Sequence, residues 1–373
     1  MTFAYREQYQ TRIERQKTFF SRNTPGDLLV YVDHWCRLPT LDNYLMDVLE
    51  GEPLQVARQP ARVREIIRNH LKECRDRYAS FYAAPDDMVP GRSEVFCAIG
   101  AITAAMTGKQ ALIDSHTTWC ELELAWDEIA QLRFDPDNEW IQFALELNNA
   151  LWEQWEEDFL FMPYCHRSPL DAANGIRGTQ MFIDMYEEPE QVHALINWCA
   201  DWSIQVEQFL DDNVQHPRGL GRCCWGTWLP DGAIWVNGDP VGMITRAMQP
   251  VFDAPYTGKL FSTVGGGFFH HHAIGLHQVD QVVQTAGICV QEIYPDPNVP
   301  HPVVSMLSDP EICDRMVQAS LVTPIMLDWV PVPLLDELLP RIAEGRFILA
   351  LQCFSPELVE EGCRKVRKWS NLD

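Results

Sequence analysis

Two histidines separated by one residue form the pattern in this sequence that points most directly to chemistry. His270 and His272 stand at the end of an apolar run in FFHHHAIGLHQVD, and His277 follows seven residues after His270. In an extended strand, residues i and i+2 project from the same face. The spacing therefore predicts that the two imidazoles converge on a metal ion or an anionic substrate, whereas His271 points to the other face.

Polar residues also follow several other apolar runs. They are Tyr164 and His166 after FLFMPYCH, Glu292 after GICVQEI, Asp328 after TPIMLD, and Cys353 after FILALQC. If these runs are strands of one barrel, their carboxyl ends meet at a single mouth, where barrel enzymes place their chemistry. Histidine, glutamate and cysteine are ligands that zinc prefers. We therefore predict that His270, His272 and Cys353 bind Zn²⁺ and leave a fourth position open for substrate or water.

Each of these residues also has a structural interpretation. Two histidines beside an apolar run are often hydrogen-bonded core residues, and a cysteine in an apolar strand, such as Cys353, is by default a packing residue. Glu292 is expected to have a partner, because a carboxylate buried without one is costly. We expect Glu292 to act as a fourth ligand or a base. His277 is expected to open the next helix and to orient a ligand or bind substrate, and Tyr164 joins the catalytic set.

Short apolar runs alternate with amphipathic helical segments from about Glu94 onward. The strand candidates are EVFCAIG, DFLFMPYC, GRCCWGTWL, KLFSTV with GGGFFHHH, GICVQEIY, TPIMLDWV and FILALQCF. Such alternation is typical of βαβ units with a parallel sheet. It predicts an α/β fold of the (β/α)8 TIM barrel type, and a doubly wound open sheet is the alternative. The sequence has no GxGxxG after a first strand, which disfavours a dinucleotide-binding fold.

The first part of the chain has a different residue pattern. TFAYREQYQTRIERQKTFF and ARVREIIRNHLKECRDRYASFY are polar segments with helical apolar spacing. We predict an N-terminal helical extension over residues 1–90 and the barrel over residues 91–373. Residues 230–258 are rich in Pro, Gly and Asp and predict a long loop with a short helix. Trp225, Trp228 and Trp235 flank this loop and are expected to line a substrate pocket.

Charge and composition exclude several classes of partner. The chain has 373 residues and a formal net charge of −24, so nucleic acids and anionic membranes are poor partners. The sequence shows no apolar signal core and no run of membrane-spanning length, which predicts a cytoplasmic protein. The 12 cysteines include no CxxC pair, which argues against a zinc ribbon or a thioredoxin-type site.

Three segments resemble the uroporphyrinogen decarboxylase superfamily, which includes zinc-dependent, corrinoid-linked methyltransferases. They are SPLDAANGIRGTQMFIDMYEEPEQVHALINW (168–198), NGDPVGMITRAMQPVFDAPY (237–256) and FHHHAIGLHQVDQVVQTAGI (269–288). The resemblance implies a (β/α)8 barrel with a helical N-terminal extension. Methyltransferases of this group carry His-x-Cys and a later Cys, where this chain has His270-x-His272 and Cys353. The Arg-rich N-terminal motif of the decarboxylases is absent.

The resemblance implies a metal-dependent methyltransferase or demethylase that acts on a small molecule with a corrinoid-carrying partner protein. In the alternative, a metal-free decarboxylase, the histidines and Asp239 stabilise developing charge by hydrogen bonding. A barrel metallohydrolase is a further alternative, although its HxH lies on the first strand. A non-catalytic small-molecule-binding barrel also remains open. We expect a monomer or a homodimer.

Overall fold

The structure is a computed structural model that describes residues 5–32, 58–81, 85–89, 91–92, 99–113, 118–120, 122–157, 160–162 and 164–372. Its main sheet has seven strands in the order β1-β13-β12-β11-β10-β9-β6, and every pairing is parallel. The strands are β1 Leu28–Val32, β6 Cys165–Arg167, β9 Ile234–Asn237, β10 Gly267–His272, β11 Ile288–Tyr294, β12 Ile325–Pro331 and β13 Phe347–Gln352. A mixed α/β fold with a parallel sheet is thus confirmed, while the described strands do not close into a ring.

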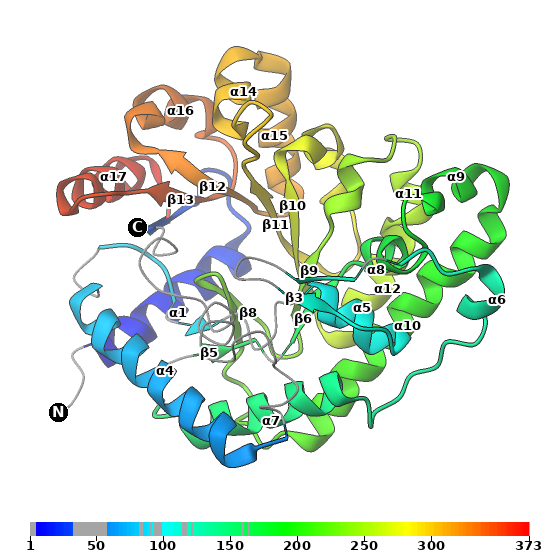
Figure 1. The fold of residues 1–373 in the computed structure, drawn as a ribbon. Coiled ribbons are helices and arrows are strands. Elements are labelled where there is room, and N and C mark those ends of the chain that lie inside the picture. Colours follow the sequence, from blue (N-terminus) through cyan, green and yellow to red (C-terminus); the bar gives the residue numbers. More distant parts are fainter. Residues whose placement is uncertain are drawn as a thin grey trace.

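Helices follow the strands of the sheet in alternation and lie around its outside (Figure 1). They are α8 Pro169–Arg177, α9 Gln180–Glu187, α10 Pro189–Asn213, η1 Asp239–Gly242, α11 Gln249–Phe252, α12 Ala254–Val264, η2 Ala273–Gln278, α13 Val279–Val282, α14 Pro302–Ser308, α15 Pro310–Val322, η3 Val332–Leu334, α16 Leu335–Ile342 and α17 Pro356–Trp369. Earlier in the chain come α1 Tyr5–Arg22, α4 Pro60–Phe81, α5 Ile99–Thr107, α6 Trp126–Ile129 and α7 Glu139–Glu153. Short pairs of strands complete the fold: β2 Gly91–Arg92 with β5 Leu160–Phe161, β3 Leu112–Ile113 with β4 Thr118–Trp119, and β7 Arg222–Cys224 with β8 Thr227–Leu229.

The two faces of the sheet pack into different cores. One buried cluster collects side chains from every strand of the sheet: Leu29, Tyr31, Cys165, Trp235, Phe268, Val290, Met326, Ile348 and Ala350. The alternate residues of the strands, such as Val30, Leu327 and Leu349, pack instead with α15, α16 and α17. This alternation follows from the period of two along a strand. Each strand of the sheet is therefore buried on both faces, as expected for a parallel sheet.

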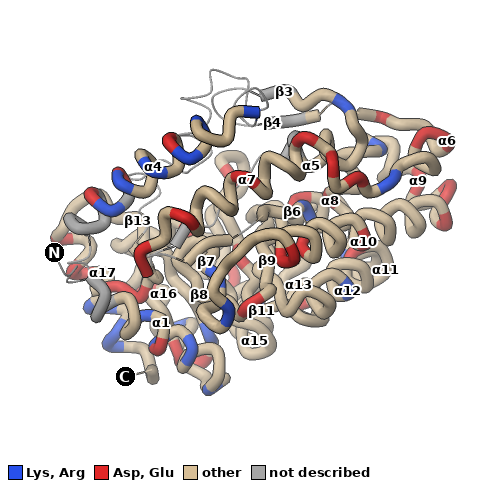
Figure 2. Tube along the Cα trace, turned by 90° about the horizontal axis from the view of Figure 1, so that it is seen from below, with Lys and Arg blue, Asp and Glu red and all other residues tan. Residues whose placement is uncertain are grey.

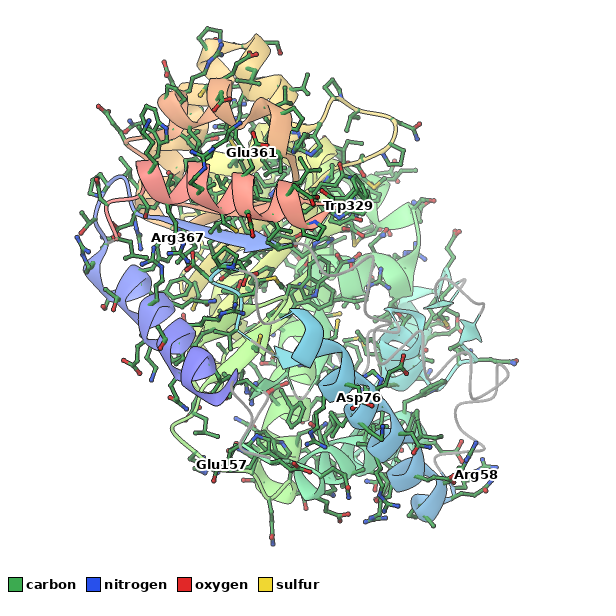
Figure 3. All side chains as sticks on the ribbon, turned by 90° about the vertical axis from the view of Figure 1, so that its left-hand side faces the viewer. Arg58, Asp76, Glu157, Trp329, Glu361 and Arg367 are labelled. Carbon is green, nitrogen blue, oxygen red and sulfur yellow. The ribbon has the colours of Figure 1, made fainter. Side chains whose placement is uncertain are left out.

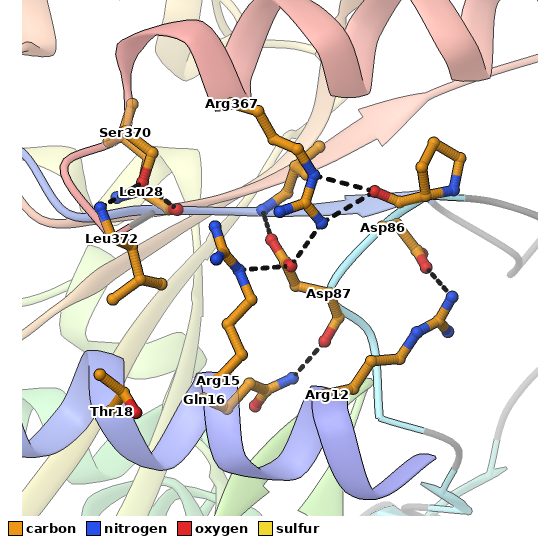
Figure 4. A network of polar contacts seen from close by, with 12 residues as sticks. Arg12, Arg15, Gln16, Thr18, Leu28, Asp86, Asp87, Arg367, Ser370 and Leu372 are labelled. Carbon is orange, nitrogen blue, oxygen red and sulfur yellow. Dashed lines mark hydrogen bonds and ion pairs between the residues drawn. The ribbon is translucent and has the colours of Figure 1, made fainter. Parts of the chain in front are cut away.

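A network of carboxylates and arginines covers the edge of the sheet at β1 (Figure 4). Residues 85–89 run beside β1, where the Asp87 N–H donates to the Val30 carbonyl at 2.8 Å. The Val30 N–H donates to the Asp87 carboxylate at 2.9 Å, and the Val32 N–H donates to the Asp86 carboxylate at 3.1 Å. Ion pairs balance these carboxylates: Arg12 with Asp86, and Arg15 and Arg367 with Asp87. Side-chain oxygens thus accept N–H groups that a neighbouring strand normally binds. Figure 3 labels Arg367 on α17.

Several predictions of secondary structure were wrong, each for a local reason. The strand β1 lies within residues 1–90, which we predicted to be helical, and it pairs with β13. KLFSTV belongs to α12, which ends at Gly265 in the left-handed conformation (φ 116°) that glycine adopts without strain. GRCCWGTWL is an antiparallel hairpin instead of a sheet strand. Residues 94–98 of EVFCAIG lie outside the described residues.

The predicted long loop over residues 230–258 contains strand β9 and the helices η1 and α11, and it leads into α12. The loop prediction was therefore wrong for most of the segment, although Asp239 does lie just past the end of a strand, separated from it by Gly238. Gly265 and Gly266 then separate α12 from β10, and a Cβ on Gly267 would lie 2.0 Å from the Phe261 ring. The three glycines therefore permit the close packing of α12 against the start of β10.

Acidic and basic residues are interspersed on many helices, as along α4 in Figure 2. Other elements are purely acidic in their ionisable residues, such as α6 with Asp127 and Glu128. The net charge of −24 is thus distributed over the chain. Within the described residues, every helix is too short or too polar to cross a bilayer.

Candidate metal centre

The register of three neighbouring strands places His270 between two polar residues. On one side His270 pairs with Asn237 of β9, and on the other it pairs with Glu292 of β11. Side chains that lie opposite each other in a parallel sheet project from the same face. The Nδ1 atom of His270 is hydrogen-bonded to Oε2 of Glu292, and both side chains are buried. This bond leaves Nε2 of His270 for a ligand.

The second histidine, His272, is likewise hydrogen-bonded through Nδ1 to a carboxylate, here that of Asp296. Its Nδ1 lies 2.7 Å from Oδ1 of Asp296, and its Nε2 lies 3.5 Å from Oδ1 of Asp239. Asp239 is the first residue of η1, one residue beyond the end of β9, and Asn237 donates a hydrogen bond of 2.8 Å to its other oxygen. The side chains of His272 and Asp239 are 31% and 43% exposed, so this part of the centre faces solvent.

Ligand atoms of Asp239, His270 and His272 all lie within 4.8 Å of one another. Two imidazoles and one carboxylate form a set that proteins use for zinc and for iron(II). Nδ1 of each imidazole is hydrogen-bonded to a carboxyl group, Glu292 or Asp296, which is the outer-shell arrangement found around metal-bound histidines. Oδ1 of Asp239 is buried and has no hydrogen-bond donor among the described residues, so it is an acceptor that a cation can satisfy.

Burial determines the protonation of this centre. It lowers the pKa of His270 to about 4, against the opposing charge of Asp239, so the ring is neutral at pH 7. Burial also raises the pKa of Glu292 well above its usual range, while the charge of His272 opposes the shift. The pKa of Asp239 is raised by burial and then by the charge of Asp171. A neutral imidazole is the form that binds a metal.

His271 confirms the alternation that the sequence predicted. It is fully buried on the other face of β10, and its Nε2 lies 2.7 Å from the side-chain nitrogen of Gln291. Its Nδ1 lies 2.9 Å from the His272 carbonyl oxygen. Burial lowers its pKa to about 3, so it is a neutral structural histidine.

The remaining predicted site residues lie apart from this group. Cys353 is buried in the apolar cluster between the sheet and α15 to α17, together with Val359 and Cys363. His277 lies in η2, where its Nε2 is 3.1 Å from the Ile244 carbonyl oxygen and its Nδ1 is 3.2 Å from that of Ile274. It therefore connects the segments that follow β9 and β10.

Tyr164 is fully buried beside His166, with their ring centroids 4.9 Å apart. His166 bonds to Glu207 at 2.9 Å, and Glu207 in turn pairs with Arg222 at 2.9 Å. Burial raises the pKa of Tyr164 above its usual value. This buried network is separate from the group of Asp239, His270 and His272.

Sequence reasoning missed Asp296, which positions His272. The signal was present in the strand period, because Glu292, Tyr294 and Asp296 are spaced by two and share one face if the strand direction continues. It also missed Asn237, which orients Asp239 and precedes it by two residues. Trp225 and Trp235, which we expected to wall a pocket, do lie beside His270, with ring centroids 5.6 and 5.7 Å from it.

Comparison with known proteins gives a fold relationship. No model of a protein family matches this chain, and no curated protein matches it. Among solved structures, a methyltransferase from Methanosarcina mazei is similar with a TM-score of 0.53, and the alignment covers 96% of this chain and 97% of that chain. The sequence identity is 10%, so the similarity shows a shared fold.

Proposed function

We propose that this protein is a metal-dependent methyltransferase or demethylase that acts on a small molecule together with a corrinoid-carrying partner. One observation carries the proposal: Asp239, His270 and His272 converge at the carboxyl ends of β9 and β10 with ligand atoms within 4.8 Å of one another. The solved neighbour, whose name describes a methyltransferase, supports the choice of reaction class.

We also propose that the fold is a (β/α)8 barrel of the uroporphyrinogen decarboxylase type, in which residues 1–90 supply strand β1 to the barrel and the rest of that region forms the N-terminal extension. The inner cluster supports closure, because Leu29 and Tyr31 from edge strand β1 pack in the same cluster as Cys165 from the opposite edge strand β6. We call Asp239, His270 and His272 the ligand group. In such a barrel the ligand group lies at the mouth, where active sites of this architecture are found.

The residues present fit a zinc ion better than magnesium or calcium. His270 and His272 offer imidazole nitrogens, and the hard cations prefer oxygen ligands. Three protein ligands with one open position form the pattern of catalytic zinc sites. When bound, the metal supplies Lewis acidity that lowers the pKa of a thiol or another acceptor.

The protein's own residues then have separate tasks. Asp239, His270 and His272 hold the metal, and Asn237 keeps the Asp239 carboxylate in place through its 2.8 Å hydrogen bond. Asp296 orients His272, and Glu292 orients His270. Glu292 is therefore a positioning residue, which acts through His270.

The test uses methylcobalamin as the methyl donor and dithiothreitol as the thiol acceptor. In the methyl transfer, the thiolate sulfur forms the new bond to carbon, and the cobalt keeps both electrons of the broken Co–C bond. We expect zinc-loaded protein to accelerate loss of the methylcobalamin absorption. The His270→Ala, His272→Ala double variant should be reduced to the rate without protein.

A matched control is His216→Ala, which removes a half-exposed histidine bonded to Asp211 at 3.0 Å, outside the ligand group. It should keep the full rate and the bound zinc. A wild-type rate equal to the rate without protein, in samples shown to contain zinc, would contradict the proposed methyl transfer. Methyl transfer that a chelator leaves unchanged would contradict the proposed metal dependence.

A further inference from the structure

Four aromatic side chains gather around the ligand group, and we call them the aromatic cluster: Trp225, Trp235, Tyr294 and Trp329. The Trp225 and Trp235 rings stack at 5.9 Å, and Tyr294 meets the edge of Trp225 at 6.4 Å. Tyr294 also contacts Trp329 at 5.4 Å. The cluster comes from the β7–β8 hairpin and the strands β9, β11 and β12, so it is assembled from distant parts of the chain.

The cluster contacts both histidines of the ligand group. The His270 ring lies within 5.9 Å of the centroids of Trp225, Trp235 and Tyr294. Tyr294 also meets the His272 ring at 5.5 Å. Trp225, Tyr294 and Trp329 are each partly exposed, so aromatic surface remains for a ligand beside the metal.

Two members of the cluster have strained backbones. Trp225 (φ 47°) and Trp329 (φ 50°) are two of the four described non-glycine residues with positive φ. A bulky residue in this region costs on the order of 1–3 kcal/mol, and such strain is concentrated at functional sites. Trp225 occupies the two-residue turn of the hairpin, and Trp329 lies at a register irregularity of β12 between Leu327 and Val330. Bulges next to active sites re-aim side chains.

The surroundings of the cluster are acidic. Asp239, Glu292, Asp296 and Asp328 are the carboxyl groups associated with the two histidines. A divalent metal ion would balance two of these four carboxyl groups. The nearby Arg167 is already paired with Asp171 at 2.8 Å. The remaining charge is therefore complementary to a cationic ligand.

One buried donor adds a second requirement. Trp235 is 4% exposed, and its Nε1–H has no acceptor among the described residues. A buried N–H without an acceptor is costly and is normally satisfied. A ligand bearing a hydroxyl or carboxylate oxygen can supply this acceptor.

Resting on the proposed function, we propose that the substrate of this site carries a methylated ammonium group, which the aromatic cluster binds through cation–π contacts. Aromatic faces attract a quaternary ammonium through their quadrupole, and tryptophan does so best. A hydroxyl or carboxylate on the same molecule would accept the Trp235 N–H. The bound metal and the ammonium group thus occupy neighbouring parts of one acidic site.

The test compares choline with 3,3-dimethyl-1-butanol, its neutral isostere, by calorimetric titration of the zinc-loaded protein. We expect choline to bind about tenfold more tightly or better, because the isostere lacks only the charge. Trp329→Asn should weaken choline binding about tenfold, since asparagine tolerates the left-handed backbone while removing the ring. Tyr294→Leu is the second variant and should have the same direction of effect.

Trp369→Leu is the control, because Trp369 is partly exposed at the end of α17, outside the aromatic cluster. It should leave choline binding unchanged, and circular dichroism should show all variants folded. Equal binding of choline and its isostere, or absence of choline binding to zinc-loaded protein, would overturn the inference. Preferential binding of the neutral ring compound anisole would overturn it as well.

Metal content measured on the same samples separates the two proposals. Protein without metal that still prefers choline would retain the inference and remove the proposed metal dependence. Protein with stoichiometric zinc that binds choline no better than the isostere would retain the metal centre and remove the ammonium substrate.

Discussion

His272 and Asp296 form a fixed pair at the carboxyl end of the sheet. Nδ1 of His272 lies 2.7 Å from Oδ1 of Asp296, and the other oxygen of Asp296 accepts the Ile274 N–H at 3.0 Å. The carboxylate is thus held by the backbone, and it fixes the orientation of the imidazole. Nε2 of His272 consequently faces Asp239 at 3.5 Å, which is the relationship on which the candidate metal centre depends.

Removing the Asp296 carboxylate should weaken metal binding while leaving all three ligands in place. We expect Asp296→Ala to lower zinc affinity by about 10–100-fold, the usual effect of losing an outer-shell partner. Competition with a chromophoric chelator measures this affinity. Asp309→Ala is a suitable comparison, because Asp309 caps α15 through Glu311 and Ile312 and should leave zinc affinity unchanged. Unaltered zinc affinity in Asp296→Ala would contradict the role of Asp296.

Substitution of Cys353 distinguishes two possible ligand sets. If Asp239, His270 and His272 are the ligands, Cys353→Ala should retain its zinc, because Cys353 packs in the apolar cluster near α17. The variant should be destabilised by about 1 kcal/mol through the loss of buried volume. Metal analysis beside urea denaturation tests both parts. Loss of zinc from a folded Cys353→Ala protein would restore the His270, His272 and Cys353 set.

The sequence predicted the histidine pair because two residues spaced by two need only a strand to share a face. It placed Asp239 with them only in the metal-free alternative. Spacing alone does not indicate Asp239 as a possible metal ligand, because that contact depends on the register of β9 against β10. For Cys353, the position in the sequence pointed to the barrel mouth, but the packing of the side chain does not. It follows the last strand, as a ligand of the mouth would, yet its side chain lies in the outer apolar cluster. The side on which a residue just past a strand packs is decided by tertiary contacts.

The elements of the fold were predictable where the periodicity was long and uninterrupted, as in α10 and α17. Prediction failed for KLFSTV, because a short apolar run fits a buried strand and a helix equally well. It also failed for β1, whose five residues lie between polar helices. The pairing of β1 with β13 joins the two ends of the chain, so no local signal indicates it.

Asp253 should make stability depend on pH. Burial raises its pKa to about 6 in the folded protein from 3.8, with hydrogen bonds from Thr257 and Gln249 opposing the shift. The folded protein therefore binds this proton more tightly than the unfolded chain, so the group favours folding at low pH and opposes it above pH 6. Asp253→Asn should be more stable than wild type at pH 8, by roughly 2–3 kcal/mol.

The advantage of Asp253→Asn should shrink as pH falls below about 6, where the folded wild type takes up the proton, and it should vanish only below the unfolded pKa of 3.8, where the carboxyl is protonated in both states. Urea denaturation of both proteins at pH 5 and pH 8 measures the difference. Asp127→Asn, on short helix α6, provides a comparison with an acidic residue that is not buried. A difference between Asp253→Asn and wild type that is equal at the two pH values would contradict the assignment.

The network at the edge of β1 should contribute strongly to stability. Asp87 accepts the Val30 N–H and pairs with Arg15 and Arg367, and its side chain is 1% exposed. Asp87→Ala leaves the buried Val30 N–H and two partly exposed arginines without their acceptor, which costs about 3 kcal/mol. Urea denaturation should show this loss. Asp336→Ala removes an exposed partner of Lys365 and should cost less than about 1 kcal/mol.

The metal content of the purified protein tests the central claim most directly. Mass spectrometry on protein prepared without added metal should find roughly one zinc ion per chain, the stoichiometry of a three-ligand catalytic site. The His270→Ala, His272→Ala double variant, shown to be folded by circular dichroism, should contain none. Equal metal content in the two proteins, or wild-type protein that takes up no zinc even when it is supplied, would contradict the account.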